Sequence, residues 1–89
     1  MTDVNTVLAE RGKRYGEFIG HAVIAQRLKL TMQGAGSWDI LCDDQREALE
    51  MIQHKIARIL NGDPDYTDNW IDIAGYATLV TKRLEGSQA

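Results

Sequence analysis

The sequence predicts an all-α protein, a small helical bundle of about four helices. Apolar residues recur every three to four positions over long stretches, and no stretch gives a convincing strand. Glycines, the single proline and polar capping residues divide the chain into four helical segments. The 89 residues form a single helical domain, residues 1–89, and a chain of this length buries only about 60–65% of its unfolded surface. We therefore expect a partner subunit or a ligand to add stability.

The first two helices are predicted from their caps and breaks. The first runs from about Asp3 to Arg11, and Gly12 ends it. The second runs from about Glu17 to Gln33 and ends where two glycines in segment 34–37 allow a turn. The apolar side of the second helix consists of Phe18, His21, Ala22, Ala25, Leu28 and Met32. A short apolar segment, expected to cover one end of the core, follows with Trp38, Ile40 and Leu41.

Two long antiparallel helices are predicted for the C-terminal half. The third helix starts at a capping box of Asp44 and Glu47 and stops at NGDPD, residues 61–65, which contains both a glycine and the proline. The fourth spans about residues 67–84 and starts at a threonine or aspartate cap. The apolar stripe of the third helix consists of Leu49, Ile52, Ile56, Ile59 and Leu60.

The fourth helix is apolar on two sides. One side carries Trp70, Ile73, Ala74, Ala77, Val80 and Leu84. The other side carries Ile71, Gly75 and Leu79. Such a helix is either central in its bundle or shared with a second chain. Because Gly75 costs roughly 1 kcal/mol relative to alanine in a helix interior, a close backbone approach is its expected reason. We therefore expect a homo-oligomer.

Composition excludes several classes of function. A net charge of −3 argues against general nucleic-acid binding, which needs a positive field along the phosphate backbone. No apolar run is long enough to span a membrane. The one cysteine, Cys42, cannot form an internal disulfide, and the N-terminus lacks the features of a signal peptide. A cytoplasmic location is expected.

A stripe of charged side chains on the third helix is the first candidate site. Glu47, Glu50, His54 and Arg58 share one side of that helix, opposite its apolar stripe. Mg²⁺ prefers one or two carboxylates together with substrate phosphates and water, so the stripe is a candidate magnesium and phosphate site. The alternative interpretation is a solvated helix face with ordinary charge pairs.

The acidic residues of the last two helices resemble a known signature. Glu47-x-x-Glu50, followed after eighteen residues by Asn69-x-x-Asp72, is similar to the acidic motif of the MazG-like all-α NTP pyrophosphatases. That resemblance implies a Mg²⁺ site with Glu47, Glu50 and Asp72 as ligands and cleavage of nucleoside triphosphates to monophosphate and pyrophosphate. The sequence departs from the pattern at Asn69, a neutral residue in place of the third acid, and Asp68 is the other candidate for that position.

The segment RGKRYGEF, residues 11–18, is the second candidate site. Lys13 and Arg14 precede the expected start of the second helix, whose free N–H groups suit a phosphate, and Tyr15 could stack on a base. The segment lacks P-loop spacing, and the alternative is a charged turn between two helices. The residues expected to bind phosphate or ligand are Lys13, Arg14, Tyr15, His54, Lys55 and Arg58.

A broader resemblance covers most of the chain. RGKRYGEF, HKIARILNGDPDYTDNW and DIAGYA are similar to segments of small helical proteins of tailed bacteriophages and of phage nucleotide-modification-associated proteins. This resemblance implies a phage origin, a location in the cytoplasm of the infected host, and nucleotide chemistry.

Three functions follow from these observations. The first is non-catalytic binding or sequestration of a phosphorylated nucleotide, for instance a host defence signal. The second is a Mg²⁺-dependent nucleoside triphosphate pyrophosphohydrolase of the MazG-like type. The third is an interaction module that inhibits a host protein through its acidic helix face. Sequestration is favoured, because replacing one metal-ligand charge by Asn69 impairs catalysis more than phosphate binding.

Overall fold

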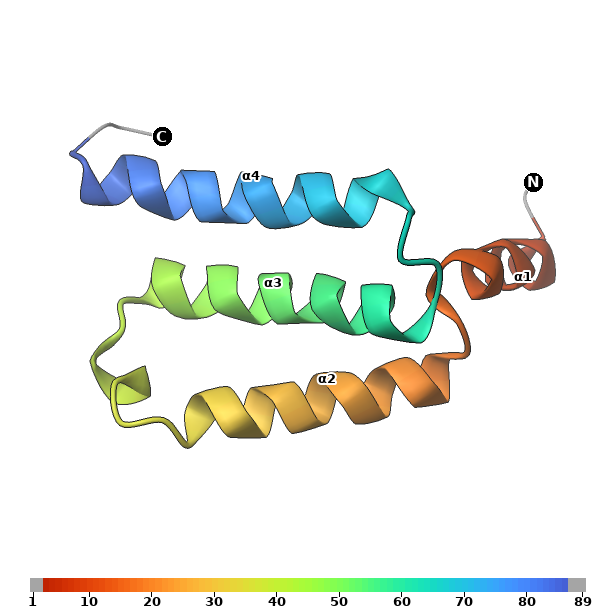
Figure 1. Cartoon of the computed structure of the whole chain (residues 1–89), viewed down its shortest axis with the longest axis horizontal. Helices are drawn as coiled ribbons and strands as arrows, with labels where there is room; N and C mark the ends of the chain where they lie inside the picture. Colours follow the sequence, from red (N-terminus) through yellow and green to blue (C-terminus); the bar gives the residue numbers. More distant parts are fainter. Residues whose placement is uncertain (1–2, 87–89) are drawn as a thin grey trace.

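The computed structural model describes residues 3–86, and within them it contains helices and no strand. The α-helices are, in chain order, α1 (Val4–Tyr15), α2 (Phe18–Gln33), α3 (Asp43–Asn61) and α4 (Thr67–Leu84). A 3₁₀ turn, η1 (Trp38–Ile40), lies between α2 and α3. The all-α class with four helices is therefore confirmed (Figure 1).

The first helix is longer than predicted. It continues past Gly12, at a cost of about 1 kcal/mol for a glycine in a helix interior, and Arg14 binds Glu10 one turn earlier. The helix stops at Gly16, whose φ of 76° is strained for any residue with a side chain. The segment RGKRYGEF is thus the last turn of α1, a two-residue corner and the start of α2. The prediction that α1 ends at Arg11 was wrong.

The start of α3 also differs from the prediction. Cys42 is the N-cap residue, and its backbone N–H donates a hydrogen bond of 2.9 Å to the side-chain oxygen of Gln45. Asp44 forms no capping box with Glu47, because its carboxylate accepts two hydrogen bonds of 2.7 Å from the guanidinium of Arg83 on α4. Asp44, which the local pattern predicted as the cap, therefore forms a long-range ion pair with Arg83 instead.

Two smaller differences concern the segments around α3 and α4. Tyr66 is the N-cap residue of α4, and Asp68 accepts a hydrogen bond from the Tyr66 hydroxyl instead of capping the helix. Arg46 of α3 donates hydrogen bonds to the Trp38 and Asp39 carbonyls of η1. Trp38 is half-buried, but Ile40 is 80% exposed. The segment therefore covers the end of the bundle only partly, through Trp38.

Helix α3 is the central element of a single layer. Figure 1 shows α2 and α4 along opposite sides of α3, with α1 at the end where α3 stops. Asp44 in the first turn of α3 pairs with Arg83 in the last turn of α4. Further along, Lys55 pairs with Asp72 at 3.0 Å between the same two helices. Because α3 has only these two lateral neighbours, two faces of it remain outside the layer.

The core is small and partly polar. In the part of the chain that the structure describes, the buried apolar residues are alanines, namely Ala25, Ala48 and Ala57. The buried polar residues are His21, Gln53, Lys55 and Asn69. The apolar stripe predicted for α3 faces one of the open sides, so that Leu60, for example, is 66% exposed. The predicted core stripes are therefore only partly buried by residues 3–86.

Gly75 on α4 likewise has no neighbour packed against it among residues 3–86. A side chain at this position would meet nothing within 4 Å, so the close approach expected from the sequence is not made within the chain. Among residues 3–86, none of the helices is long and apolar enough to cross a membrane.

Candidate functional site

A pocket lies where the end of α1, the start of α2 and the C-terminal half of α3 meet. Its volume is ≈ 420 Å³, within the range of small-molecule sites, about 300–1,000 Å³. It is lined by Leu8, Arg11, Gly12, Tyr15, Gly16, Glu17, Phe18, His21, His54 and Arg58. We call this cavity the α1–α3 pocket.

Hydrogen bonds from Asn61 and Asp63 attach the corner between α1 and α2 to the end of α3. We call these contacts the Asn61 clasp, and they shape the pocket. The side-chain nitrogen of Asn61 donates hydrogen bonds of 2.8 Å to the carbonyl oxygens of Tyr15 and Glu17. The backbone N–H of Asp63 donates a 2.7 Å hydrogen bond to the carbonyl of Arg14. A side chain at Gly62 would collide with the backbone of Arg14 and Tyr15, so only glycine fits there. The walls of the pocket are therefore held by backbone contacts.

Arg58 supplies a positioned positive charge. Its guanidinium carbon lies 4.1 Å from the centre of the Tyr15 ring, a cation–π contact, and the residue is half-buried. Arg11 brings a second guanidinium from α1 and is exposed. Glu17 is the single carboxylate among the residues that line the pocket. The arrangement suits an anionic ligand with oxygen acceptors, since guanidinium groups bind phosphate and carboxylate with paired hydrogen bonds.

Two histidines form the inner wall. The rings of His21 and His54 lie edge to face with their centres 4.6 Å apart, and the Phe18 ring lies 6.2 Å from His21. His21 is 6% exposed, and its Nδ1 atom has no hydrogen-bond partner within residues 3–86. A buried polar atom without a partner is costly and uncommon.

Both histidines are held in the neutral form. Burial, followed by the charge of Arg58, lowers the pKa of His54 to about 4. Burial is also the main cause that lowers the pKa of His21, and Arg58 again adds to it. At neutral pH each imidazole therefore has one N–H donor and one nitrogen acceptor. The net positive charge of the wall comes from the two arginines.

The structure brings three of the predicted ligand-binding residues into this pocket. Tyr15, His54 and Arg58 all line it, although Tyr15 lies about forty residues before the other two in the chain. Sequence reasoning missed Arg11 and treated His21 as a core residue. Arg11 would have been found if the first helix had been continued through Gly12, because positions 8, 11, 12 and 15 then share one side of a helix.

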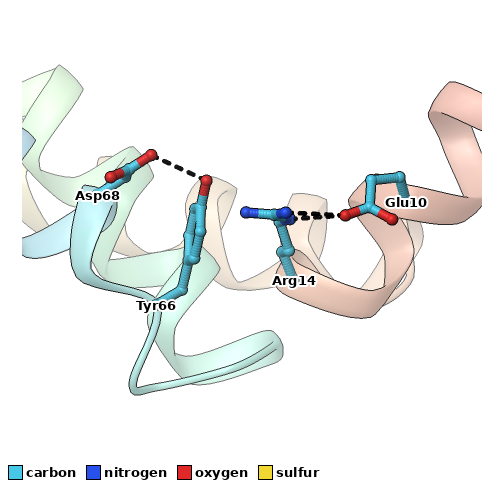
Figure 2. A network of polar contacts seen from close by, with 4 residues as sticks. All are labelled: Glu10, Arg14, Tyr66 and Asp68. Atoms are coloured by element: carbon cyan, nitrogen blue, oxygen red, sulfur yellow. Dashed lines mark hydrogen bonds and ion pairs between the residues drawn. The ribbon is translucent and has the colours of Figure 1, made fainter.

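The predicted Arg14 lies outside the pocket lining and serves the helix corner. Its guanidinium contacts the Glu10 carboxylate at 2.8 Å and lies 4.5 Å from the centre of the Tyr66 ring. The Tyr66 hydroxyl in turn donates a 2.8 Å hydrogen bond to Asp68 (Figure 2). This chain of contacts joins α1 to the start of α4. Lys13 is exposed and is likewise absent from the residues that line the pocket.

Lys55 is also directed elsewhere. Its ammonium group binds the Asp72 carboxylate at 3.0 Å, and its side chain is only 11% exposed. The pair lies between α3 and α4, so the predicted phosphate ligand Lys55 and the predicted metal ligand Asp72 neutralise each other.

The remaining predicted metal ligands do not gather around Asp72. The ion pair places Asp72 beside Lys55, five residues beyond Glu50, which is about 7.5 Å along the helix axis. Glu47 lies a further turn away, and Asn69 is 1% exposed inside the α3–α4 contact. Among the described residues, no three histidine, cysteine, aspartate or glutamate side chains are placed to hold one metal ion. The Mg²⁺ site of Glu47, Glu50 and Asp72, with Asn69 or Asp68, stays a prediction.

Fold and site together define a small helical protein with an aromatic, arginine-lined pocket. The family described as "Domain of unknown function (DUF6378)" matches residues 2–84, and the chain belongs to that family. No curated protein and no solved structure matches the chain.

Proposed function

We propose that the protein is a homo-oligomer that binds a phosphorylated nucleotide in the α1–α3 pocket without converting it. The observation that carries the proposal is the placement of Arg58 against the Tyr15 ring, in a pocket that His21 and His54 also line. A guanidinium held by a ring is already oriented, so a phosphate that binds it has less side-chain entropy to lose.

The parts of the pocket match the parts of a nucleotide. Arg58 and Arg11 supply five N–H donors each for phosphate oxygens. The ring of Phe18, which is 78% exposed, offers a face on which a base can stack. The neutral imidazoles of His21 and His54 add donors and acceptors that can bind the base or sugar.

Binding without turnover is favoured by where the acids lie. Glu17 is the one carboxylate among the pocket residues, whereas Glu47, Glu50 and Asp72 belong to other parts of α3 and α4. The resemblance to phage proteins makes a host signalling nucleotide the first ligand class to test. On the same resemblance we propose a location in the cytoplasm of an infected bacterium.

The test is a thermal-shift and calorimetric screen of mono-, di-, tri- and cyclic nucleotides, each with Mg²⁺ and with a chelator. A bound ligand at a hundred times its dissociation constant adds about 2.7 kcal/mol to the free energy of unfolding. We expect a shift that survives the chelator and a nucleotide that is recovered intact. A Mg²⁺-dependent shift with release of pyrophosphate would establish the pyrophosphohydrolase instead.

Two matched variants locate the site. Arg58→Met keeps most of the side-chain volume and removes the guanidinium, and we expect it to weaken binding at least tenfold, about 1.4 kcal/mol. Arg14→Met makes the same change outside the pocket and is expected to leave affinity unchanged. Absence of a shift with every nucleotide would reject the proposed function and favour an interaction with a host protein.

A further inference from the structure

One face of the α3–α4 pair is apolar along its whole length. Leu49, Ile56 and Leu60 lie on one side of α3, and Trp70, Ala77 and Leu84 recur every seven residues on α4. The two stripes meet across a hollow of ≈ 280 Å³ that Leu49 and Ala77 both line. We call these six residues the α3–α4 apolar face.

This face is uncovered within the chain. Leu60 is 66% exposed, Leu84 60% and Trp70 54%, whereas none of the buried apolar residues among 3–86 is larger than alanine. A helix pair of an ordinary soluble domain buries such stripes against a further element of its own chain. Here α2 and α1 lie elsewhere on α3, and the part of the chain that the structure describes provides no other helix.

The surface area of the chain matches one half of a dimer. Its accessible surface is 6418 Å², against about 5,200 Å² expected for a compact protein of 10.0 kDa. The excess of about 1,200 Å² is somewhat more than the roughly 800 Å² that each partner buries in a standard interface. The radius of gyration is similarly large, 15.1 Å against about 12 Å for a compact domain of this length.

The chemistry of the face suits a second uncharged, apolar helix face. No residue of the face carries a charge. The neighbouring threonines Thr78 and Thr81 donate their hydroxyl hydrogens to the carbonyls of Ala74 and Ala77 in their own helix, at 2.7 and 2.9 Å. A partner can therefore cover them without leaving a hydroxyl donor unpaired. A membrane-surface helix would instead border its apolar side with lysine and arginine.

We propose that a second copy of this chain packs on the α3–α4 apolar face, so that two α3–α4 pairs form a four-helix bundle with twofold symmetry. In such an interface the same patch serves both subunits, and no other complementary surface is required. The α1–α3 pocket contains His54 and Arg58 from the polar stripe of α3, opposite this face, so both pockets of the dimer stay open to ligand. The inference names the interface of the proposed oligomer and does not depend on the nucleotide.

The test measures the mass of the full chain by light scattering during size-exclusion chromatography, without nucleotide. We expect about 20 kDa, twice the 10.0 kDa of one chain, and about 10 kDa for Ile56→Asp at the same micromolar concentration. Ile19→Asp on the outer side of α2, where Ile19 is 76% exposed, is the matched control and should remain dimeric.

Ile71→Asp separates this interface from the other apolar side of α4, where Ile71 and Gly75 line a second hollow. We expect Ile71→Asp to stay dimeric, and dissociation of this variant with retention of the Ile56→Asp dimer would overturn the proposal. If Ile56→Asp unfolds, the wild-type melting temperature decides, because it rises with protein concentration only when folding is coupled to association. A wild-type mass of 10 kDa with a concentration-independent melting temperature would also overturn it, whatever the outcome of the nucleotide screen.

Discussion

The two faces of α3 that α2 and α4 leave free differ in how they are covered. The face with His54 and Arg58 is covered by α1 and fixed by the Asn61 clasp, so its side chains are held around a cavity. The face with Ile56 and Leu60 is only partly covered by residues 3–86, with Ile56 36% and Leu60 66% exposed. The contrast teaches that the chain makes its specific polar and backbone contacts on the face where side chains must be held in a defined geometry around a cavity. The apolar stripes, which need only a complementary surface, stay largely exposed within residues 3–86.

The largest effect is expected from breaking the clasp at Gly62. In Gly62→Ala the new methyl group would collide with the backbone of Arg14 and Tyr15, which cannot move aside without displacing α1. We expect a loss of at least about 1–3 kcal/mol in the free energy of unfolding by urea. Gly12→Ala is the control, because nothing lies within 4 Å of the added methyl and the site is inside a helix. That variant should gain about 0.4–1 kcal/mol, and equal effects of the two substitutions would contradict the clasp.

A somewhat smaller effect is expected from Asn61 itself. Asn61→Ala removes the donor that binds the Tyr15 and Glu17 carbonyls, at a cost of about 1–3 kcal/mol. Because the clasp positions α1, amide hydrogen exchange should accelerate in α1 more than at the centre of α3. Uniform acceleration across the chain would show that Asn61 stabilises the whole fold and not the pocket in particular. Asn5→Ala, at an exposed position of α1, provides the comparison.

The Lys55–Asp72 ion pair between α3 and α4 allows the loss of each partner to be compared. Asp72→Asn leaves the ammonium group of the buried Lys55 without its counter-charge. We expect a loss of about 1–2 kcal/mol, below the range for fully buried pairs because the Asp72 side chain is 45% exposed. Lys55→Met leaves only a partly hydrated carboxylate and should cost less. A greater loss in Lys55→Met, measured by urea unfolding, would mean that packing of the lysine stem outweighs the charge pair.

The last prediction concerns the pH dependence of stability on the pocket side of α3. Histidine in the unfolded chain titrates near 6.5, whereas the pKa of folded His54 is about 4. Between these values the unfolded chain binds a proton that the folded chain does not. The free energy of unfolding therefore falls as pH drops from 6.5 toward 4, and its full value is present above 6.5.

The variant His54→Gln should reduce this slope in urea unfolding measured between about pH 6.5 and 5, with part of it retained from His21, whose pKa is also lowered. The carboxylates that pair with arginine, Asp44 and Glu10, have pKa values lowered from 3.8 and 4.5 and titrate below this window. An unchanged slope in His54→Gln would show that His54 is not buried in a neutral form. A nucleotide phosphate bound beside His54 should raise its pKa, which NMR titration of the imidazole can follow.

The sequence predicted elements better than it predicted their partners. The all-α class, the four helices and the end of α4 at Leu84 were confirmed because each depends on local periodicity and on breaks such as Pro64. The end of α1 was missed because Gly12 is a weak helix breaker, and contacts made 46 residues later, at Asn61, fix the real corner at Gly16. The cap of α3 was missed for a similar reason, since Asp44 is taken by the distant Arg83.

The candidate site could be predicted only in part. Tyr15, His54 and Arg58 were selected for their chemistry, and the structure places all three around one cavity. Lys55 and Asp72 were selected by the same reasoning and form an ion pair with each other. Side-chain chemistry is visible in a sequence, but which charges neutralise one another depends on how helices are placed across a layer. That placement is a tertiary property, and spacing along the chain does not encode it directly.

The Asn61 clasp has a consequence for the order of events during synthesis. The corner at Tyr15 and Glu17 leaves the ribosome long before Asn61, which follows Glu17 by 44 residues. Because chains emerge from the N-terminus first, α1 and α2 are complete while the anchor of their corner is still untranslated. A nascent chain that stops within α3 therefore lacks the side chain that holds this corner. The contacts that shape the α1–α3 pocket are completed late, when the last turn of α3 and the following residues Gly62 and Asp63 have been added.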